Sequence, residues 1–176
     1  MSKSSSPLVQ ASQQAPTADN FMDQQIAKDF ERVVELLELG GIAGPRSRVP
    51  CTPDDVETLR HSVGCTIPQA YELFLRSMGR QAGKLFVGTD AFFPAILGLN
   101  EAGRSLISFC NEQLGTRCSI PDDALVFAMH QGYQFFCMVT SSPNPPVFHF
   151  DEGYESLKPV AGSYTDFLLQ MAQAEW

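Results

Sequence analysis

Positive charge is scarce in this sequence. Its 176 residues include 12 Lys and Arg against 20 Asp and Glu, which gives a formal net charge of −8. Nucleic-acid binding depends on clustered Lys and Arg that neutralise phosphates. We therefore expect no direct binding to DNA or RNA.

Long apolar runs are missing as well. No apolar stretch approaches the roughly 18 residues that indicate a membrane-spanning helix. Residues 1–20 are rich in Ser, Gln, Ala and Pro and lack the apolar core of a signal peptide. Because so polar a segment gains little from burial, we predict a disordered leader over residues 1–20 and no membrane partner.

Cysteine is present but not in the patterns that form metal or redox sites. The cysteines number five and include no C-x-x-C pair; they lie at positions 51, 65, 110, 118 and 137. A zinc site made of Cys110, Cys118 and a histidine would need a spacing that no standard zinc module uses. We predict free thiols and hence a cytoplasmic protein without a metal.

The sequence motifs of common enzyme classes are also absent. There is no Walker A loop, nucleophile elbow, zinc-protease motif or dinucleotide-binding glycine motif. Cys137 and His149 fall in consecutive predicted strands and are a conceivable nucleophilic pair, although no carboxylate is placed to orient the histidine. We predict a non-catalytic protein without a cofactor, and a cysteine-dependent enzyme remains the least favoured alternative.

The composition is that of a globular domain. Hydrophobic residues make up 44% and charged residues 18% of the chain. A length of 176 residues favours one domain, which we place at residues 21–176. Periodic apolar residues and capping residues predict five helices. Their expected limits are Asn20 to Gly40, Pro53 to Gly64, Pro68 to Gly79, Asn100 to Leu114, and a last helix that begins after Ser163.

Strand patterns follow the third helix. Leu85–Val87 is a short apolar run between glycines and is predicted to be a strand. Ala124–Met129 and Tyr133–Thr140 flank His130-Gln131-Gly132, which predicts a hairpin with glycine at positive φ. Val147–Phe150 and Leu157–Ala161 follow and extend the predicted meander. The expected class is α+β, with a largely antiparallel sheet, N-terminal helices and a closing C-terminal helix.

Acidic residues dominate the last third of the chain. From Ser119 onward there are seven Asp and Glu, and Lys158 is the one basic residue. This charge is typical of a solvated surface, but it is also typical of a landing site for a basic partner. The candidate partner-binding residues lie next to predicted strands: Asp122, Asp123, Asp151, Glu152 and Glu155.

The order of these motifs resembles the SUKH superfamily, also called the Smi/Knr family. Within TPDDVETLRHSVGCTIPQAYELFLRSMG, an acidic capped helix ends at glycine, and Ile67-Pro68 begins a helix with an aromatic pattern. The segments IPDDALVFAMHQGYQFFCMV, PVFHFDEG and SYTDFLLQMA are similar to the hairpin, the next strand and the last helix of the family. This sequence departs from the family pattern at two turns, His130-Gln131-Gly132 and Gly79-Arg80.

The resemblance implies a protein-binding role without catalytic residues. Bacterial members are mostly immunity proteins that block a polymorphic or contact-dependent toxin, often a nuclease. Fungal members are scaffold regulators of cell-wall assembly. Because this chain shows no long disordered extension, we expect an immunity protein with a cognate toxin domain as its partner. A non-catalytic scaffold or regulatory module is the alternative.

Overall fold

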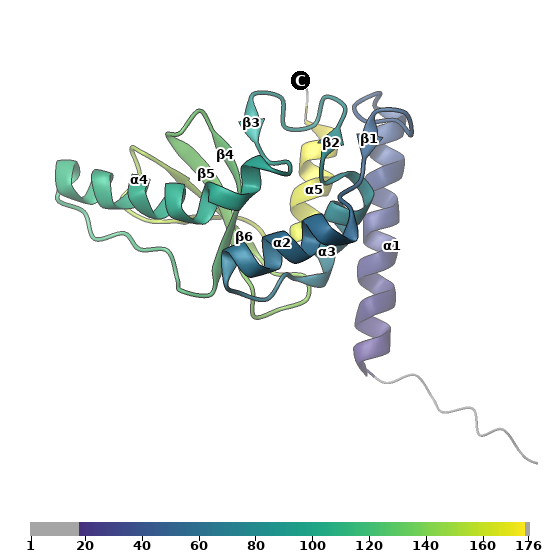
Figure 1. Ribbon diagram of the computed structural model, residues 1–176, viewed down its shortest axis with the longest axis horizontal. Helices are drawn as coiled ribbons and strands as arrows, with labels where there is room; N and C mark the ends of the chain where they lie inside the picture. The colour runs from purple at the N-terminus through teal and green to yellow at the C-terminus, as the bar shows by residue number, and fades with distance from the viewer. Residues whose placement is uncertain (1–17, 175–176) are drawn as a thin grey trace, which may run out of the picture.

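The computed structural model describes residues 18–174 (Figure 1). The five α-helices are α1 (Ala18–Leu39), α2 (Pro53–Val63), α3 (Gln69–Met78), α4 (Leu99–Leu114) and α5 (Tyr164–Gln173), and a 3₁₀ turn, η1 (Ala95–Gly98), leads into α4. Most of the predicted disordered leader, residues 1–17, lies outside the described residues. Helix α1 begins at Ala18, slightly earlier than the sequence pattern indicated.

Two antiparallel sheets complete the fold and confirm the α+β class. The small sheet pairs β1 (Arg48–Val49) with β2 (Gln81–Ala82). The large sheet has the order β3-β4-β5-β6-β7. Its strands are β3 (Thr89–Asp90), β4 (Ala124–His130), β5 (Gln134–Val139), β6 (Val147–Asp151) and β7 (Lys158–Ala161). The predicted meander is therefore confirmed, and β3 adds a short edge strand that the sequence pattern did not indicate.

The hairpin between β4 and β5 has the expected geometry. Gln131 and Gly132 both take positive φ, at 48° and 79°, and bring the chain back antiparallel. The register pairs His130 with Gln134 at the turn and Ala124 with Val139 at the far end. This register fixes which flanking residues lie at each end of the sheet.

Helices cover both faces of the large sheet. Helix α4 lies so close to one face that a Cβ atom at Gly103 would be 3.0 Å from Cγ2 of Val126, which explains a glycine inside this helix. Aromatic residues fill the other face, where the ring of Phe127 contacts Tyr71 of α3 and Tyr164 of α5. Helix α1 packs outside α3 and α5, on the side of the molecule opposite the C-terminal end of α4 (Figure 1).

The start of α2 confirms the predicted capping residues. Thr52 accepts a hydrogen bond from the backbone of Asp55, and the Asp55 carboxylate accepts one from the backbone of Thr52, which makes a capping box. Gly64 ends the helix at φ 65°.

The same Asp55 carboxylate binds Arg80, which follows α3. The guanidinium donates two hydrogen bonds, from Nε at 2.7 Å and from Nη2 at 2.8 Å. It also lies over the Phe93 ring, 5.1 Å from its centre. The bidentate Arg80 contact is the main reason that the pKa of Asp55 falls from 3.8 to about 2. This pair links the start of α2 to the chain after α3.

The Asp55–Arg80 pair gives the protein a specific acid sensitivity. A carboxyl group whose pKa is lower in the folded state stabilises the fold above its unfolded pKa and loses that contribution as pH falls to its folded pKa. We expect Asp55→Asn to lower the melting temperature by several degrees at pH 6, and the difference from wild type to shrink between about pH 4 and pH 2. Asp54→Asn, at the exposed neighbouring position, is the control and should change little. A difference that stays constant over this pH range would contradict the assignment.

The predicted strand at Leu85–Val87 is wrong. This segment is a turn between β2 and β3, in which Leu85 N–H donates to Ala82 and Thr89 N–H donates to Phe86. Phe86 has a φ of 59°. Its ring is buried against Phe74 and Phe167, while Val87 is 69% exposed. The apolar run therefore anchors a turn in the core, and its backbone hydrogen bonds are local.

Candidate partner-binding site

Asp122 and Asp123 are exposed and directly precede β4. The backbone carbonyl of Asp123 accepts hydrogen bonds from the amide and hydroxyl groups of Thr140, which fixes the start of the strand. The carboxylate of Asp122 lies 3.9 Å from Nη1 of Arg104 on α4. A cation therefore lies close to the first of these two acids.

Asp151 is the last residue of β6, and Glu152 and Glu155 lie on the turn between β6 and β7. Asp151 shapes this turn, because its Oδ1 accepts a hydrogen bond from the Gly153 backbone at 3.1 Å and its carbonyl accepts one from Tyr154. Glu152 and Glu155 are exposed. Within residues 18–174, none of these three carboxylates forms an ion pair, so their charge is available to a partner.

The structure does not bring the five candidate acids together. Ala124, next to Asp123, pairs with Val139 at one end of β5, whereas Asp151 pairs with Gln134 at the other end. Five residues of extended strand separate these positions by roughly 17 Å. The acids thus form two groups at opposite ends of the sheet, and the group at residues 151–155 is the less neutralised.

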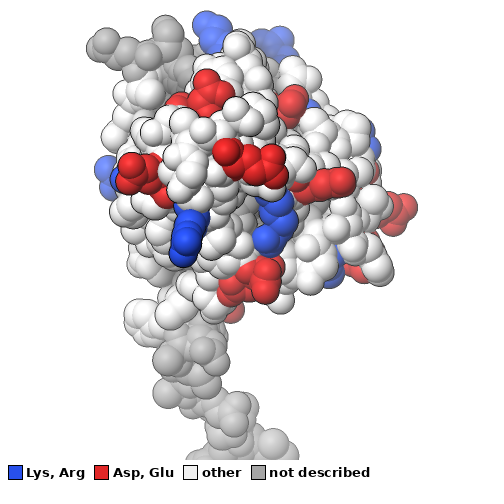
Figure 2. Space-filling model, turned by 90° about the vertical axis from the view of Figure 1, so that its left-hand side faces the viewer, with Lys and Arg blue, Asp and Glu red and all other residues white. Residues whose placement is uncertain are grey.

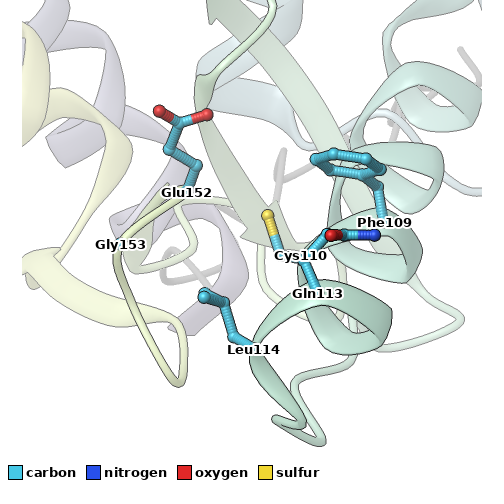
Figure 3. A pocket seen from close by; sticks show the side chains of 6 residues that line it. All are labelled: Phe109, Cys110, Gln113, Leu114, Glu152 and Gly153. Atoms are coloured by element: carbon cyan, nitrogen blue, oxygen red, sulfur yellow. The ribbon is translucent and has the colours of Figure 1, made fainter.

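A groove lies beside this second group. It has a volume of about 310 Å³ and runs between the C-terminal half of α4 and the turn that follows β6 (Figure 3). Its lining residues are Phe109, Cys110, Gln113, Leu114, Glu152 and Gly153. Figure 3 shows Leu114 directed toward the Gly153 backbone, with the Cys110 thiol between α4 and the side carrying Glu152.

Local hydrogen bonds position both walls of the groove. Helix α4 ends at Gly115, whose φ is 67°. The Asn111 side chain then holds the following chain, donating to the Cys118 carbonyl at 2.9 Å and accepting from its amide at 3.0 Å. On the other wall, Glu152 N–H donates to the carbonyl of Tyr133 in the hairpin. The turn wall is thereby fixed to the β4–β5 hairpin, and the chain after α4 is fixed to the end of that helix.

The Cys110 thiol is at the base of the groove and is buried. Burial raises its pKa, and the nearby carboxylates of Glu152 and Asp151 raise it further. The thiol is therefore protonated at neutral pH and acts as a small apolar group. All five cysteines are free thiols in the structure.

Cys137 and His149 do not form a pair. Cys137 lies opposite Phe148 and His149 lies opposite Phe136 in the β5–β6 register. Successive side chains of a strand point to opposite faces, so the two groups project from different faces of the sheet. Burial raises the pKa of Cys137 to about 12. His149 Nε2 lies 2.9 Å from Oε1 of Gln134, and its ring stacks on Phe136.

Within residues 18–174, no group of three or more His, Cys, Asp and Glu side chains is arranged to hold a metal ion. No helix in that part of the chain has the length and apolar character needed to cross a bilayer.

The sequence interpretation missed Phe109 and Leu114. They are 58% and 56% exposed, next to positions of α4 that face the sheet. The available signal was a surplus of apolar residues: Leu106, Ile107 and Cys110 already supply the inward side of this helix. An apolar residue outside the inward side of a helix can be assigned to a surface groove only when the residues that lie near it in the folded structure are known.

The fold is a small α+β domain built on an antiparallel meander. The sequence model of the SMI1 / KNR4 family (SUKH-1) matches residues 50–170, which is more than half of the chain. The protein therefore belongs to the SMI1 / KNR4 family, and the resemblance seen in its motifs is confirmed. Members of this family are generally non-catalytic immunity-type proteins. A comparison with curated proteins gives no match.

Proposed function

We propose that this protein is a cytoplasmic immunity protein that binds and neutralises a cognate polymorphic or contact-dependent bacterial toxin. The observation that carries this proposal is the family match over residues 50–170. The unpaired acids on the turn after β6 support it, because an inhibitor benefits from fast capture of its target. A toxin domain that acts on nucleic acid has basic surface, and a nuclease is therefore the favoured target class.

Co-expression tests the proposed function directly. The cognate toxin domain, sought among the genes that neighbour this one, would be induced in a bacterial host with and without the full chain. We expect growth to stop with the toxin domain alone and to resume when the chain is present. A second immunity protein of the same family, unrelated to this toxin, is the control and should give no protection.

Failure of protection would contradict the proposal, provided that folded chain accumulates in the cells. A partner with no toxic activity, recovered as a defined complex, would instead favour the scaffold or regulatory alternative. Protection that needs far less chain than toxin would favour an enzyme.

A further inference from the structure

Two exposed apolar side chains share the groove beside α4. Three of the other large exposed apolar residues in the described part of the chain, Phe21, Met22 and Leu39, lie on α1. Val49 in β1 and Val87 in the turn after β2 are exposed as well. Single exposed apolar residues are ordinary on protein surfaces. Phe109 and Leu114 differ because they line one concavity together, with the buried Cys110 at its base. Its volume of about 310 Å³ is close to the lower end of the range for ligand pockets, roughly 300–1,000 Å³.

The wall of this groove formed by the turn after β6 is negatively charged. Glu152 lines it, and Asp151 lies close enough to Cys110 to affect the thiol electrostatically. Glu112 on α4 and Glu155 on the turn are exposed. Figure 2 shows this side of the molecule, with acidic side chains spread across it and basic ones between them. The basic residues nearest in sequence to the lining residues are Arg117, Arg104 and Lys158. Arg104 donates hydrogen bonds to the carbonyls of Ile120 and Pro121, and Nζ of Lys158 lies 5.8 Å from the Tyr154 ring centre.

We propose that this groove binds an apolar side chain from a basic segment of the partner protein. The apolar side chain contacts Phe109 and Leu114, and the Lys or Arg beside it in the partner approaches Glu152 and Asp151. Charge complementarity selects this occupant, since an acidic or neutral segment would leave those carboxylates without compensation. A buried apolar anchor surrounded by polar contacts is the usual arrangement of an interface hot spot. The identification of this partner as a toxin rests on the proposed function. The expected preference of the groove for an apolar residue beside basic ones is independent of that function.

Peptide titration of the isotope-labelled full chain, followed by NMR, tests the proposal. The probe is the synthetic peptide KKGFGKK, compared with EEGFGEE and KKGAGKK. We expect KKGFGKK to shift the amides of Phe109, Gln113, Leu114 and Gly153, and to bind at least about tenfold more tightly than either comparison peptide. Phe109→Ser and Glu152→Lys should each weaken its binding by about tenfold or more. Leu39→Ser and Glu31→Lys, at exposed positions on α1, are the matched controls and should have no effect.

Equal binding of EEGFGEE, shifts confined to other surfaces, or no shifts at millimolar KKGFGKK would overturn the proposal. Groove shifts that grow with protein concentration before peptide is added would identify a second copy of the chain as the occupant, and would also overturn it. The two proposals can fail separately. Normal protection by a Phe109→Ser/Glu152→Lys chain, together with no peptide binding, would reject the groove alone. Peptide binding without protection would reject the immunity function alone.

Discussion

Gly83→Ala is expected to destabilise the fold by at least about 3 kcal/mol, more than most single substitutions. Gly83 has a φ of 56°, and a Cβ atom there would overlap the carbonyl oxygen of Ile42 and lie 3.0 Å from Cα of Ala43. That carbonyl accepts the hydrogen bond of Lys84 N–H at 2.8 Å, and Gly83 N–H donates to Ser47 at 2.9 Å. The backbone at Gly83 cannot move away without breaking the hydrogen bonds that join the turn after β2 to the loop after α1.

Gly41→Ala separates the two causes of this destabilisation, which are the strain of a positive φ and the steric overlap with Ile42. Gly41 also has a positive φ, 63°, but no atom lies within 4 Å of its added Cβ. We expect it to cost only the conformational penalty of about 1–2 kcal/mol. Urea unfolding of both variants measures the difference. An equal loss of unfolding free energy in the two variants would contradict a close contact between Gly83 and the Ile42 carbonyl.

Charge reversal of Asp151, Glu152 and Glu155 to lysine is expected to slow association with the cognate toxin domain by at least about tenfold. The three carboxylates lie at the end of β6 and on the turn that follows it, and Glu152 and Glu155 are exposed. Charges at an interface rim act mainly on the rate of encounter, so the dissociation rate should change less. Raising the salt concentration should slow wild-type association, because charges farther apart than about 8–10 Å are screened at physiological ionic strength.

Charge reversal of three acidic residues on α1 is the control that distinguishes a local effect of residues 151–155 from an effect of net charge. Asp23, Glu31 and Glu35 are exposed, and α1 lies on the side of the molecule opposite the C-terminal end of α4 (Figure 1). Reversing them gives the same net charge as the first triple. Stopped-flow kinetics at two salt concentrations would compare both variants with wild type. Similar slowing by both triples, or no slowing by either, would contradict a landing site at residues 151–155.

Most of the fold could be predicted because local chemistry specifies it. Thr52, Pro53 and Gly64 determine where α2 begins and ends, and Gly132 determines the hairpin, so nearby residues were sufficient. Leu85–Val87 failed because an apolar run shows burial without showing where the backbone hydrogen bonds go. The edge strand β3 was missed because two residues carry too little pattern to be recognised.

The candidate site was predictable only in part. The charge of Asp151, Glu152 and Glu155 is evident in the sequence, and their position on a turn follows from Gly153. Their separation from Asp122 and Asp123 follows from strand register, which composition does not reveal. The groove depends on the approach of Leu114 to Gly153 across a distant part of the chain. No local pattern encodes that approach.

Stoichiometric titration of the purified toxin domain with the purified chain tests the central claim most directly. The claim is that neutralisation occurs by direct binding, without turnover. Toxin activity should fall linearly with added chain and reach its minimum at one equivalent, and a complex of the two proteins should be recovered by gel filtration. Activity that is unaffected by excess folded chain would contradict neutralisation by binding. Inactivation by a small fraction of an equivalent, without a stable complex, would show that the protein acts as a catalyst.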